Sequence, residues 1–595
     1  MSRPVLAATL PLVLLFACGD PDSTPTSVPS LPLDADEDGF DITEDCDDRD
    51  AAVYPGADEI CDGIDNDCDD VVDGDGAIDR QTFYTDSDGD GFGDPQAPVQ
   101  ACAASAGIVS DDTDCDDTSA AAYPGGTEVC DGVDNDCDSN VDFDGWVPGD
   151  FATLEAVAAL TTASHICVAS GTYPAAGIQP LAPLTLEGAG VDATVLQGAN
   201  DIFFETVEAL TLRSLTVDDV DHDGTNWTGD GSFVYAEGPV TLENVRFDAP
   251  TITYDHGTLV YASGADVTWR DVEIDSAVVD LTSTWYGFAY VDDGLLTLDD
   301  VHIHDGTFSG TSSSYGTFYQ EYARTNMSGV VVEDNTYDFS SLYGLVWCSE
   351  ESDETGRGPG GGDTASTFAN IAVRNNTLTL SSSFYGAFSL DDYEGFFSME
   401  NVAIVGNTVT TGNGTYGWLG YADYGSGFGN TIDNLVIAGN HMDIGSGNAP
   451  IIEYFYDITG SQWDIVGNTS TSVSPGVQLD GEDWTLRNVN LVSNDSDPAV
   501  TLVYVDGLAD LDYVNVFDSD SPIAFEDDDG PVTPATRLAV DPEYVNVIGD
   551  PSTWDLTLGV GSPLIDAGDP GVLDADGSRS DIGAYGGPLG DRWSN

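Results

Sequence analysis

One recurring phrase constrains the fold of this chain more than any other feature. It occupies residues 240–247, 267–274 and 296–303, where apolar and polar residues alternate around a central Asn or Asp. Further copies lie at 398–404, 432–437 and 484–491, and the spacing between copies is mostly 25–33 residues. Alternation of this kind predicts strands with one buried face, and a fixed period of this length predicts a solenoid of stacked turns.

Two positions in the phrase carry Asn or Asp. The first set is Asn244, Asp271, Asp300, Asn370, Asn401, Asn434 and Asn488, and the second, six residues further on, is Asn335, Asn376, Asn407, Asn440 and Asn494. Asn tolerates a left-handed backbone and so marks turns. Asn side chains on successive turns can also hydrogen-bond to each other, which predicts a ladder along the solenoid.

A second phrase, built on Tyr-Gly, precedes the first by 13–17 residues in most repeats. If Phe318, Val346 and Phe388 point inward, the neighbouring aromatic residues point outward and stack into a stripe. These candidate ligand-binding residues are Tyr286, Tyr290, Tyr315, Tyr319, Tyr343, Trp347, Tyr385 and Trp418. Exposed apolar stripes usually mark interaction sites, and aromatic faces flanked by carboxylates suit sugar rings. The alternative is the opposite facing, in which the same aromatic residues fill the interior.

No stretch shows a sustained helical period, so the chain is predicted to be all-β. We expect a right-handed parallel β-helix over 146–537, with about twelve coils between residues 184 and 516. This region resembles the pectate-lyase-like superfamily. Residues 561–568 and 581–587 resemble the terminal segment of many bacterial parallel β-helix proteins, which implies that 538–595 caps the exposed edges of the last coil.

Residues 34–145 are dense in carboxylates, and much of this segment occurs twice at an offset of 69 residues. Asp-Cys-Asp-Asp stands at 45–48 and 114–117, Tyr-Pro-Gly at 54–56 and 123–125, and Cys-Asp-Gly-x-Asp-Asn-Asp-Cys at 61–68 and 130–137. The duplication predicts a folded, disulfide-stabilised module in two copies. The alternative is a solvated acidic linker, because 36 acidic residues face two Arg here and would repel each other without cations.

The alternating Asp residues are candidate metal ligands, because Asp-x-Asp-x-Asp-Gly gathers oxygen atoms around one point and Ca²⁺ takes 6–8 of them. Residues 34–45 match part of an EF-hand loop, but Asp41 stands where an apolar residue is usual and no amphipathic helix flanks the loop. The candidates are Asp34, Asp36, Asp38, Asp45, Asp65, Asp67, Asp69, Asp86, Asp88, Asp90, Asp94, Asp112, Asp114, Asp116, Asp134, Asp136 and Asp138.

The segment resembles thrombospondin type 3 repeats and, more closely, the metal-binding repeat of secreted bacterial proteins known as the MopE-like repeat. That resemblance implies a metal, and copper has been linked to the family. Residues 34–145 contain no His, Met or Lys, which disfavours soft or imidazole coordination. We therefore expect several Ca²⁺ ions, with copper as the less favoured metal.

The N-terminus predicts export. Residues 1–17 form a signal peptide with a single charge, Arg3, and an apolar run too short to span a bilayer. Leu-Phe-Ala-Cys at 15–18 resembles a bacterial lipobox, which implies cleavage before Cys18 and lipidation of its thiol. The alternative is an ordinary signal peptide with an incidental Cys. Residues 18–33 form a Pro/Ser/Thr tether, so we expect a bacterial cell-envelope protein, on the outer membrane or cell surface, held by its lipid alone.

Export implies an oxidising compartment, so disulfides are expected. The candidates are Cys46, Cys61, Cys68, Cys102, Cys115, Cys130, Cys137 and Cys167. The sequence leaves their connectivity open. One arrangement joins Cys46 to Cys61 and Cys115 to Cys130 inside the modules, joins Cys68 to Cys102 and Cys137 to Cys167 between segments, and leaves Cys348 as a buried thiol.

The net charge of −94 excludes nucleic acid as a partner, because phosphates would be repelled. We expect an anchored, calcium-binding lipoprotein whose β-helix binds a polysaccharide or a cell-surface partner without catalysis. The alternative is a calcium-dependent polysaccharide lyase or glycoside hydrolase, since the β-helix superfamily includes both, although fold alone does not establish function.

The sequence locates no catalytic residues. A lyase would need a basic residue near calcium, but the chain has no Lys and its Arg residues are scattered. A hydrolase needs two carboxylates at a set separation. Available ones are Asp219, Asp221, Asp223, Asp292, Asp293, Asp391 and Asp392, but carboxylates are too common for pairs to be informative. His222, His256, His302, His304 and His441 form no recurring column, and we expect His302 and His304 to be solvated.

Overall fold

The computed structural model describes most of the chain from Asp34 to Ala584. The described residues are 34–126, 128–130, 133–139, 144–175, 177–198, 203–218, 221–222, 232–253, 257–281, 285–321, 324–350, 366–390, 397–415, 417–422, 430–445, 452, 458–470, 477–480, 484–492, 503–506, 509–517, 525–527, 530–531, 536–547, 551, 554–573 and 578–584. The signal peptide, Cys18 and the tether lie outside them.

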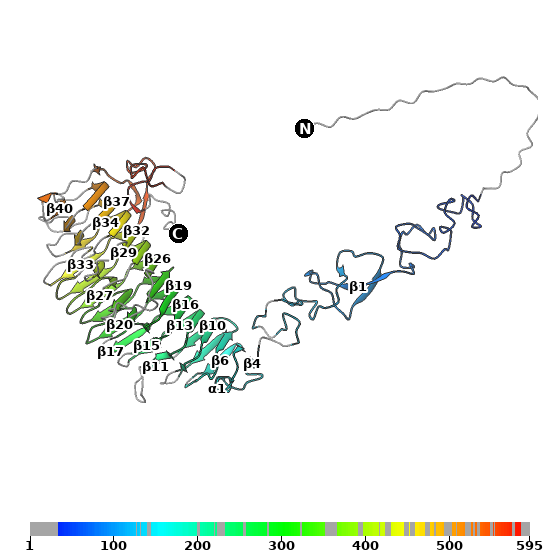
Figure 1. Ribbon diagram of the computed structural model, residues 1–595, viewed down its shortest axis with the longest axis horizontal. Coiled ribbons are helices and arrows are strands. Elements are labelled where there is room, and N and C mark those ends of the chain that lie inside the picture. Colours follow the sequence, from blue (N-terminus) through cyan, green and yellow to red (C-terminus); the bar gives the residue numbers. More distant parts are fainter. Residues whose placement is uncertain are drawn as a thin grey trace, which may run out of the picture. The chain divides into compact units, whose positions relative to one another are not determined.

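Contacts divide the chain into two units, which are considered separately: residues 1–127 with 136–138, and residues 128–135 with 139–595. The first unit has one antiparallel sheet of β1 (Gln81–Thr85), β2 (Pro98–Ala101) and β3 (Ile108–Val109), and its remaining described residues form turns (Figure 1). The second unit is a stack of parallel strands with one short helix, α1 (Leu154–Ala158). No helix among the described residues has the length and apolar character to cross a bilayer.

Three parallel sheets form the walls of the solenoid. The longest contains β4 (Trp146–Val147), β5 (Ser164–Val168), β6 (Gly171–Pro174), β7 (Leu184–Gly188), β8 (Thr194–Gln197), β10 (Leu210–Asp218), β13 (Val240–Asp248), β16 (Val267–Asp275), β19 (Leu295–His304), β22 (Arg324–Ser328), β23 (Val331–Glu333), β26 (Ser366–Arg374), β29 (Phe397–Val405), β32 (Asn430–Ala438), β34 (Ile458–Val466), β37 (Trp484–Val492), β39 (Ala509–Phe517) and β42 (Arg537–Leu538).

The second sheet contains β11 (Asp221–His222), β14 (Thr251–Ile252), β17 (Val278–Leu281), β20 (Thr307–Gly310), β24 (Thr336–Phe339), β27 (Thr377–Leu380), β30 (Thr408–Thr411), β33 (His441–Ile444) and β35 (Thr469–Ser470). The third contains β9 (Phe204–Thr206), β12 (Ser232–Ala236), β15 (Thr258–Ser263), β18 (Ala289–Asp292), β21 (Phe318–Glu321), β25 (Trp347–Glu350), β28 (Phe388–Leu390) and β31 (Leu419–Ala422).

The solenoid has about eight turns, so the prediction of twelve coils is wrong. The first phrase forms strands of the longest sheet, which has more strands than the other two sheets. The third sheet ends at β31, and β36 (Val477–Asp480), β38 (Val503–Asp506), β40 (Phe525–Asp527) and β41 (Gly530–Pro531) form a separate sheet. The longest sheet thus extends beyond the turns in which all three sheets are continuous.

The recurring phrase lies in register from strand to strand, with Val240 opposite Val267 and Val267 opposite Leu296. Its first Asn or Asp interrupts each strand in a left-handed conformation, as predicted. The φ angles are 51° at Asn244, 52° at Asp271, 54° at Asp300, 55° at Asn370, 57° at Asn401, 58° at Asn434 and 57° at Asn488. Alternating residues such as Leu242, Val245 and Phe247 are buried in one continuous apolar core.

The second Asn position forms the predicted ladder. The side-chain amides of Asn335, Asn376 and Asn407 donate to Oδ1 of the next Asn along the solenoid at 3.2, 2.9 and 3.0 Å. Asn440 donates to Asn468 at 2.9 Å. These buried amides satisfy each other, which ties successive turns together. Asn494, the last predicted member, lies outside the described residues.

The C-terminal segment includes the hairpin of β43 (Tyr544–Asn546) and β44 (Asp555–Leu558). The described part of this segment packs along the outer face of the longest sheet, where Leu556 and Ala584 bury Val436 and Val466 in a second apolar cluster. That the segment caps the last coil stays a prediction. Residues on β29, β32, β34 and β37 all contribute to this cluster.

Candidate functional site

The first Asp-rich loop folds around its own carboxylates. Asp34 accepts hydrogen bonds from the backbone N–H groups of Glu37 at 2.7 Å and Gly39 at 3.1 Å, and Gly39 turns the chain at a φ of 110°. One carboxylate oxygen each of Asp36, Asp38 and Asp45 is buried and has no hydrogen-bond partner. Such oxygens are costly to bury unless a cation or a donor compensates them.

A second loop repeats this arrangement. Asp86 accepts a hydrogen bond from Gly89 N–H at 2.7 Å, and Asp114 accepts one from Asp116 N–H at 2.8 Å. Buried oxygens of Asp88, Asp90 and Asp114 lack a hydrogen-bond partner, as their counterparts do in the first loop.

Electrostatics in both loops favour a bound cation. Desolvation by burial and the charges of neighbouring carboxylates raise the pKa of Asp36, Asp88 and Asp114. Each carboxylate is therefore destabilised as an anion by its surroundings. A hard divalent cation among these oxygens would remove both causes and satisfy the orphaned atoms.

A stacked aromatic pair marks the two loops as copies. Phe40 stacks on Tyr54 with ring centroids 5.5 Å apart, and Phe92 stacks on Tyr123 at 5.6 Å. Phe92 follows Phe40 by 52 residues, whereas Tyr123 follows Tyr54 by 69. The second copy therefore has an insertion of β-structure between its Asp-x-Asp loop and Asp114. The shared Asp-Gly-Phe triplet, at 38–40 and 90–92, is the sequence signal that could have revealed this.

The other candidate ligands divide into two groups. Asp65 accepts hydrogen bonds from the N–H groups of Asp69 and Asp70 at 3.1 and 2.9 Å, and Asp67 has a pKa raised by desolvation and by Asp69, so 65–70 forms a further acidic loop. Its sequence copy contains Asp134, Asp136 and Asp138. Three other candidates make hydrogen bonds of their own: Asp94 and Asp116 accept local ones from Gln96 and Thr118, and Asp112 hydrogen-bonds to Tyr84.

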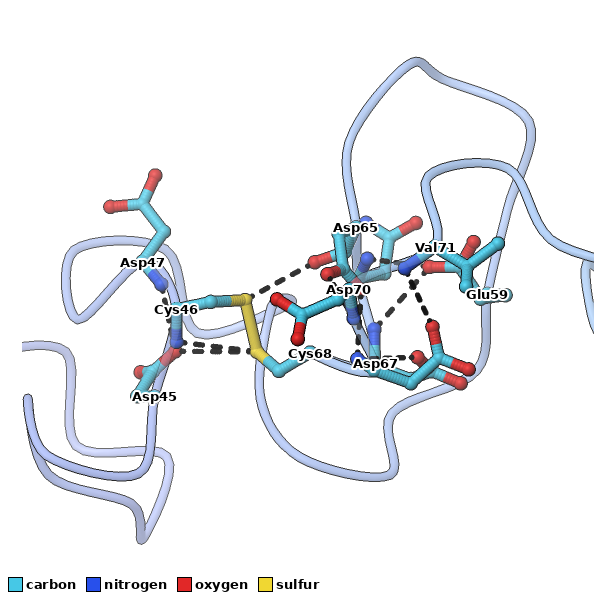
Figure 2. Close-up of a disulfide and its surroundings, with 11 residues drawn as sticks. Asp45, Cys46, Asp47, Glu59, Asp65, Asp67, Cys68, Asp70 and Val71 are labelled. Carbon is cyan, nitrogen blue, oxygen red and sulfur yellow. Dashed lines mark hydrogen bonds between the residues drawn. A yellow bond between two sulfur atoms is a disulfide. The ribbon is translucent and has the colours of Figure 1, made fainter.

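All eight candidate cysteines form disulfides, but the predicted pairing is wrong. The bonds are Cys46–Cys68, Cys61–Cys102, Cys115–Cys137 and Cys130–Cys167. The Tyr-Pro-Gly turn decides the pairing, because Tyr54 N–H donates to Asn66 O at 2.9 Å and Gly56 N–H to Asp67 O at 3.1 Å. This brings Cys68, and not Cys61, against Cys46 (Figure 2).

The disulfides bear on metal identity. Asp45, Cys46 and Cys68 lie close enough to surround one ion, and so do Asp114, Cys115 and Cys137. However, both sulfur atoms of each group are bonded to each other, so they are not thiolates. Carboxylate oxygens are left as the charged ligand atoms of these groups.

Tyrosines on the third sheet and in the segments just before its strands form two stacked rows outside the main core. The first row is Tyr235, Tyr261, Tyr290 and Tyr319, with ring centroids 4.7–5.3 Å apart. The second is Tyr286, Tyr315, Tyr343 and Tyr385, at 4.5–5.2 Å. Phe318, Val346 and Phe388 are buried in the core, which confirms the facing assumed for the stripe. Sequence reasoning missed Tyr235 and Tyr261, which lack the Tyr-Gly phrase.

The tyrosines of the first row are more buried than predicted, since we expected an exposed stripe. Tyr319 is 1% exposed and Tyr290 is 8% exposed, because the second row packs over them, as in the contact of 4.5 Å between Tyr315 and Tyr319. The rings also stack face to face along the solenoid. Their faces are therefore directed at neighbouring tyrosines and not outward.

One member of the predicted stripe is wrong, and the backbone of a second is out of register with the others. Trp418 is fully buried in the main core, where its ring packs edge-on against Phe384 at 5.5 Å. The backbone of Trp347 pairs with Phe318 and Phe388, and Cys348 takes the register position of Tyr319. The cause is one extra residue between Tyr343 and its strand, which shifts the register by one relative to the phrases at 315 and 385.

The structure thus defines a protein class: an acidic, disulfide-bonded, metal-binding region followed by a parallel β-solenoid. A family model described as "Cu-binding_MopE: Putative metal-binding motif" matches residues 45–74 and 114–142. The acidic region therefore contains two copies of this motif. Both matched stretches begin at or next to the orphaned carboxylates of Asp45 and Asp114.

Other comparisons are less informative. No curated protein matches the chain. Among solved structures, the catalytic domain of a GH87 alpha-1,3-glucanase in complex with nigerose has 14% identity and a TM-score of 0.24, and the match covers 63% of each chain. A variant of that domain in complex with tetrasaccharides has 12% identity, the same coverage and the same TM-score. At this level the likeness carries no conclusion about activity.

Proposed function

We propose that this protein is a calcium-binding lipoprotein of the bacterial cell envelope. Ca²⁺ orders the acidic region of residues 34–145, and the β-solenoid presents a surface that binds polysaccharide without cleaving it. The observation that carries the calcium assignment is the set of orphaned, buried oxygens on Asp36, Asp38 and Asp45 and on Asp88, Asp90 and Asp114.

Ligand chemistry favours calcium over the copper in the name of the matching family. Copper prefers imidazole and sulfur ligands, whereas Ca²⁺ prefers carboxylate and carbonyl oxygen. The acidic region has no His or Met, and its seven cysteines are in disulfides. Oxygen is therefore the only ligand type that this region can supply in quantity.

The test compares the full-length chain with Ca²⁺, with chelator and with Cu²⁺. Binding of Ca²⁺ to the folded form alone stabilises that form, so protease should cut within 34–145 after chelation and leave it intact with Ca²⁺. Asp36→Asn combined with Asp88→Asn should weaken Ca²⁺ binding. Asp62→Asn, at an exposed residue that accepts a hydrogen bond from Ile64, is the matched control and should not. Equal protease resistance with and without chelator, or tight stoichiometric Cu²⁺ binding, would contradict the assignment.

The lipid anchor rests on the lipobox-like residues that precede Cys18. Cys18→Ser should release the protein from membranes and abolish labelling by a radioactive fatty acid. If the wild-type chain carries no acyl group and the variant remains membrane-bound, the anchor is ruled out.

Polysaccharide binding is supported by the second tyrosine row, which is half-buried and repeats one ring per turn along the solenoid. A regular row of aromatic side chains suits an extended chain of sugars. A glycan array probed with the full-length protein, with and without Ca²⁺, should show retention without bond cleavage. Tyr315→Ala should weaken that retention, whereas Asn413→Ala, an exposed change on another side of the turn, should not.

Cleavage of a retained glycan would instead favour the lyase or hydrolase alternative. Of the carboxylates available to a hydrolase, Asp292 lies near Ser263 and Asp293 occupies a turn with a φ of 54°. The structure describes no side chain for Asp219, Asp221, Asp223, Asp391 or Asp392. The carboxylates singled out from the sequence therefore give no pair whose separation can be judged, and binding is proposed on the tyrosine rows instead.

A further inference from the structure

A cluster of histidines and carboxylates lies on the outer face of the longest sheet, far along the chain from the acidic loops. Register places Arg246, Glu273 and His302 side by side on β13, β16 and β19. Asp248, Asp275, His304 and Glu333 form the adjacent row, two residues further along each strand. These positions face outward because the residues between them, such as Ile274 and Ile303, are buried in the core.

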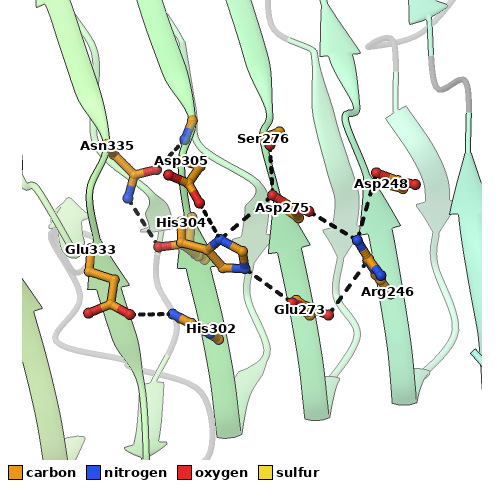
Figure 3. A network of polar contacts seen from close by, with 12 residues as sticks. Arg246, Asp248, Glu273, Asp275, Ser276, His302, His304, Asp305, Glu333 and Asn335 are labelled. Atoms are coloured by element: carbon orange, nitrogen blue, oxygen red, sulfur yellow. Dashed lines mark hydrogen bonds and ion pairs between the residues drawn. The ribbon is translucent and has the colours of Figure 1, made fainter.

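The geometry around His304 resembles that of a metal-binding imidazole. Its Nδ1 lies 3.0 Å from Asp305 Oδ2 and 3.6 Å from Asp275 Oδ1, and its Nε2 lies 3.1 Å from Glu273 Oε1 (Figure 3). If Nδ1 donates its proton to Asp305, Nε2 presents a lone pair to the carboxylate of Glu273. Two acceptors then face each other, and a cation between them would turn this repulsion into attraction.

His302 completes the cluster. Its Nε2 lies 2.9 Å from Glu333 Oε1, and its ring centroid lies 4.3 Å from that of His304. One potential ligand atom from each of Glu273, His302 and His304 lies within 4.8 Å of the other two. The sequence prediction that His302 and His304 are merely solvated is therefore incomplete, because strand register brings both against carboxylates.

We infer that Glu273, His302 and His304 form a binding site for one divalent transition-metal ion of the Zn²⁺ type. Imidazole with carboxylate is a common ligand set for Zn²⁺ and a poor one for Ca²⁺. Carboxylates that hold the other imidazole nitrogen, as Asp305 does for His304, are the usual outer shell of such sites. This site is independent of the calcium loops and of the proposed polysaccharide binding.

Charge on this face supports a dication. Asp248, Glu273, Asp275, Asp305 and Glu333 supply five carboxylates, and the described ion pairs set two guanidinium groups, of Arg246 and Arg374, against them. A bound divalent ion would offset this difference.

Small side-chain rotations suffice to close the site. Zn–N bonds are about 2.0–2.1 Å long, so two nitrogens on one ion lie at most about 4.2 Å apart. The candidate ligand atoms of Glu273, His302 and His304 lie within 4.8 Å of one another. The side chains of His302 and Glu273 are 42% and 43% exposed, which leaves both free to turn.

The test is calorimetric titration of the full-length chain with Zn²⁺ in excess Ca²⁺, so that the oxygen sites are occupied. We expect one Zn²⁺ equivalent whose dissociation constant rises at least tenfold in His302→Gln, in His304→Gln and in Glu273→Gln. His441→Gln is the matched control, because His441 hydrogen-bonds to Thr469 on another sheet. The Zn²⁺ affinity of this variant should equal that of the wild-type chain. Co²⁺ bound to the wild-type chain should give d–d absorption bands that both His variants lose.

Two results would overturn the inference. One is Zn²⁺ binding that is the same in the double variant His302→Gln/His304→Gln as in the wild-type chain, which would place the ion elsewhere. The other is absence of Zn²⁺ binding to the wild-type chain under these conditions. The side chain of His302 is only partly buried, so His302→Gln should fold even if His304→Gln does not.

Discussion

The hydroxyl group of Tyr544 donates a hydrogen bond of 2.8 Å to Oδ1 of Asp464, which joins the C-terminal segment to β34. Asp464 also accepts hydrogen bonds from the Asn490 side chain at 2.8 Å and from Ala584 N–H at 2.9 Å. Burial outweighs these three donors and raises the pKa of Asp464 to about 6. A titrating group therefore lies under the segment that covers this face of the solenoid.

This contact predicts a pH dependence of stability. Because the native state holds the Asp464 proton more tightly than the unfolded chain, the contribution of this group is complete below about pH 4 and is lost as the pH rises through about 6. The loss is on the order of 3 kcal/mol. Asp464→Asn cannot titrate, so its stability relative to wild type should improve by up to that amount between pH 4 and pH 7 in denaturant unfolding.

Tyr544→Phe provides the companion measurement. It removes a hydrogen bond that lowers the pKa of Asp464, so the pH-dependent loss should move to higher pH. If Asp464→Asn and wild type show the same pH dependence, Asp464 does not titrate in this range and the argument is wrong.

The Asn ladder predicts a large cost for one buried amide. Asn407→Ala removes the acceptor of the Asn376 amide and a donor to Asn440. Each group left unsatisfied in the interior costs about 1–3 kcal/mol, so unfolding free energy should fall by about 2–4 kcal/mol. Asn413→Ala, where the amide is exposed and bonds to Ser382, should cost under about 0.5 kcal/mol. Equal costs for both variants would contradict the ladder.

The tyrosine rows predict that one outward-facing residue behaves like a core residue. Tyr319 is 1% exposed, so Tyr319→Ala should cost about 3–5 kcal/mol, similar to Trp418→Ala in the main core. Tyr385→Ala should lower the free energy of unfolding by less, because Tyr385 is half-buried at the end of the second row. Denaturant melts that place Tyr319→Ala within about 0.5 kcal/mol of wild type would show that the row is solvated.

The second acidic loop predicts that Asp114, although distant in sequence from Asp88, binds the same Ca²⁺ ion. Asp114→Asn should weaken Ca²⁺ binding as much as Asp88→Asn, because both residues have an orphaned buried oxygen in the same cluster. Asp94→Asn, although closer to Asp88 in sequence, should have little effect since Asp94 bonds to Gln96 in a local turn. Calcium titrations in which Asp94→Asn is the more damaging change would refute this grouping.

The disulfide pairing predicts specific peptides. Proteolysis without reduction should release Cys46 linked to Cys68 and Cys115 linked to Cys137, identified by mass spectrometry. Replacing both Cys115 and Cys137 by Ser should cost about 3 kcal/mol, as expected for a closed loop of this length. A Cys46–Cys61 peptide would indicate the other pairing.

Local chemistry explains what the sequence predicted correctly. Asn and Asp are the non-glycine residues that best tolerate a positive φ, so Asn244, Asp271 and Asp300 mark the bend of each strand without knowledge of any contact. Alternation of apolar residues revealed which face is buried, and the repeat length revealed the solenoid. The acidic duplication and its carboxylate loops are equally local, because Asp-x-Asp-x-Asp-Gly folds around its own oxygens.

Tertiary structure decided the features that depend on register and on contacts between distant segments. The hydrogen bonds from Tyr54 and Gly56 make Cys68 the partner of Cys46. A single extra residue after Tyr343 places Cys348, and not Trp347, at the register position of Tyr319. Register also places Glu273 beside His302. The two residues are 29 positions apart in sequence, and nothing in the sequence alone indicates that they are neighbours. Side-chain pattern specifies the period of a solenoid, but the packing of one turn on the next determines which residues of neighbouring periods meet.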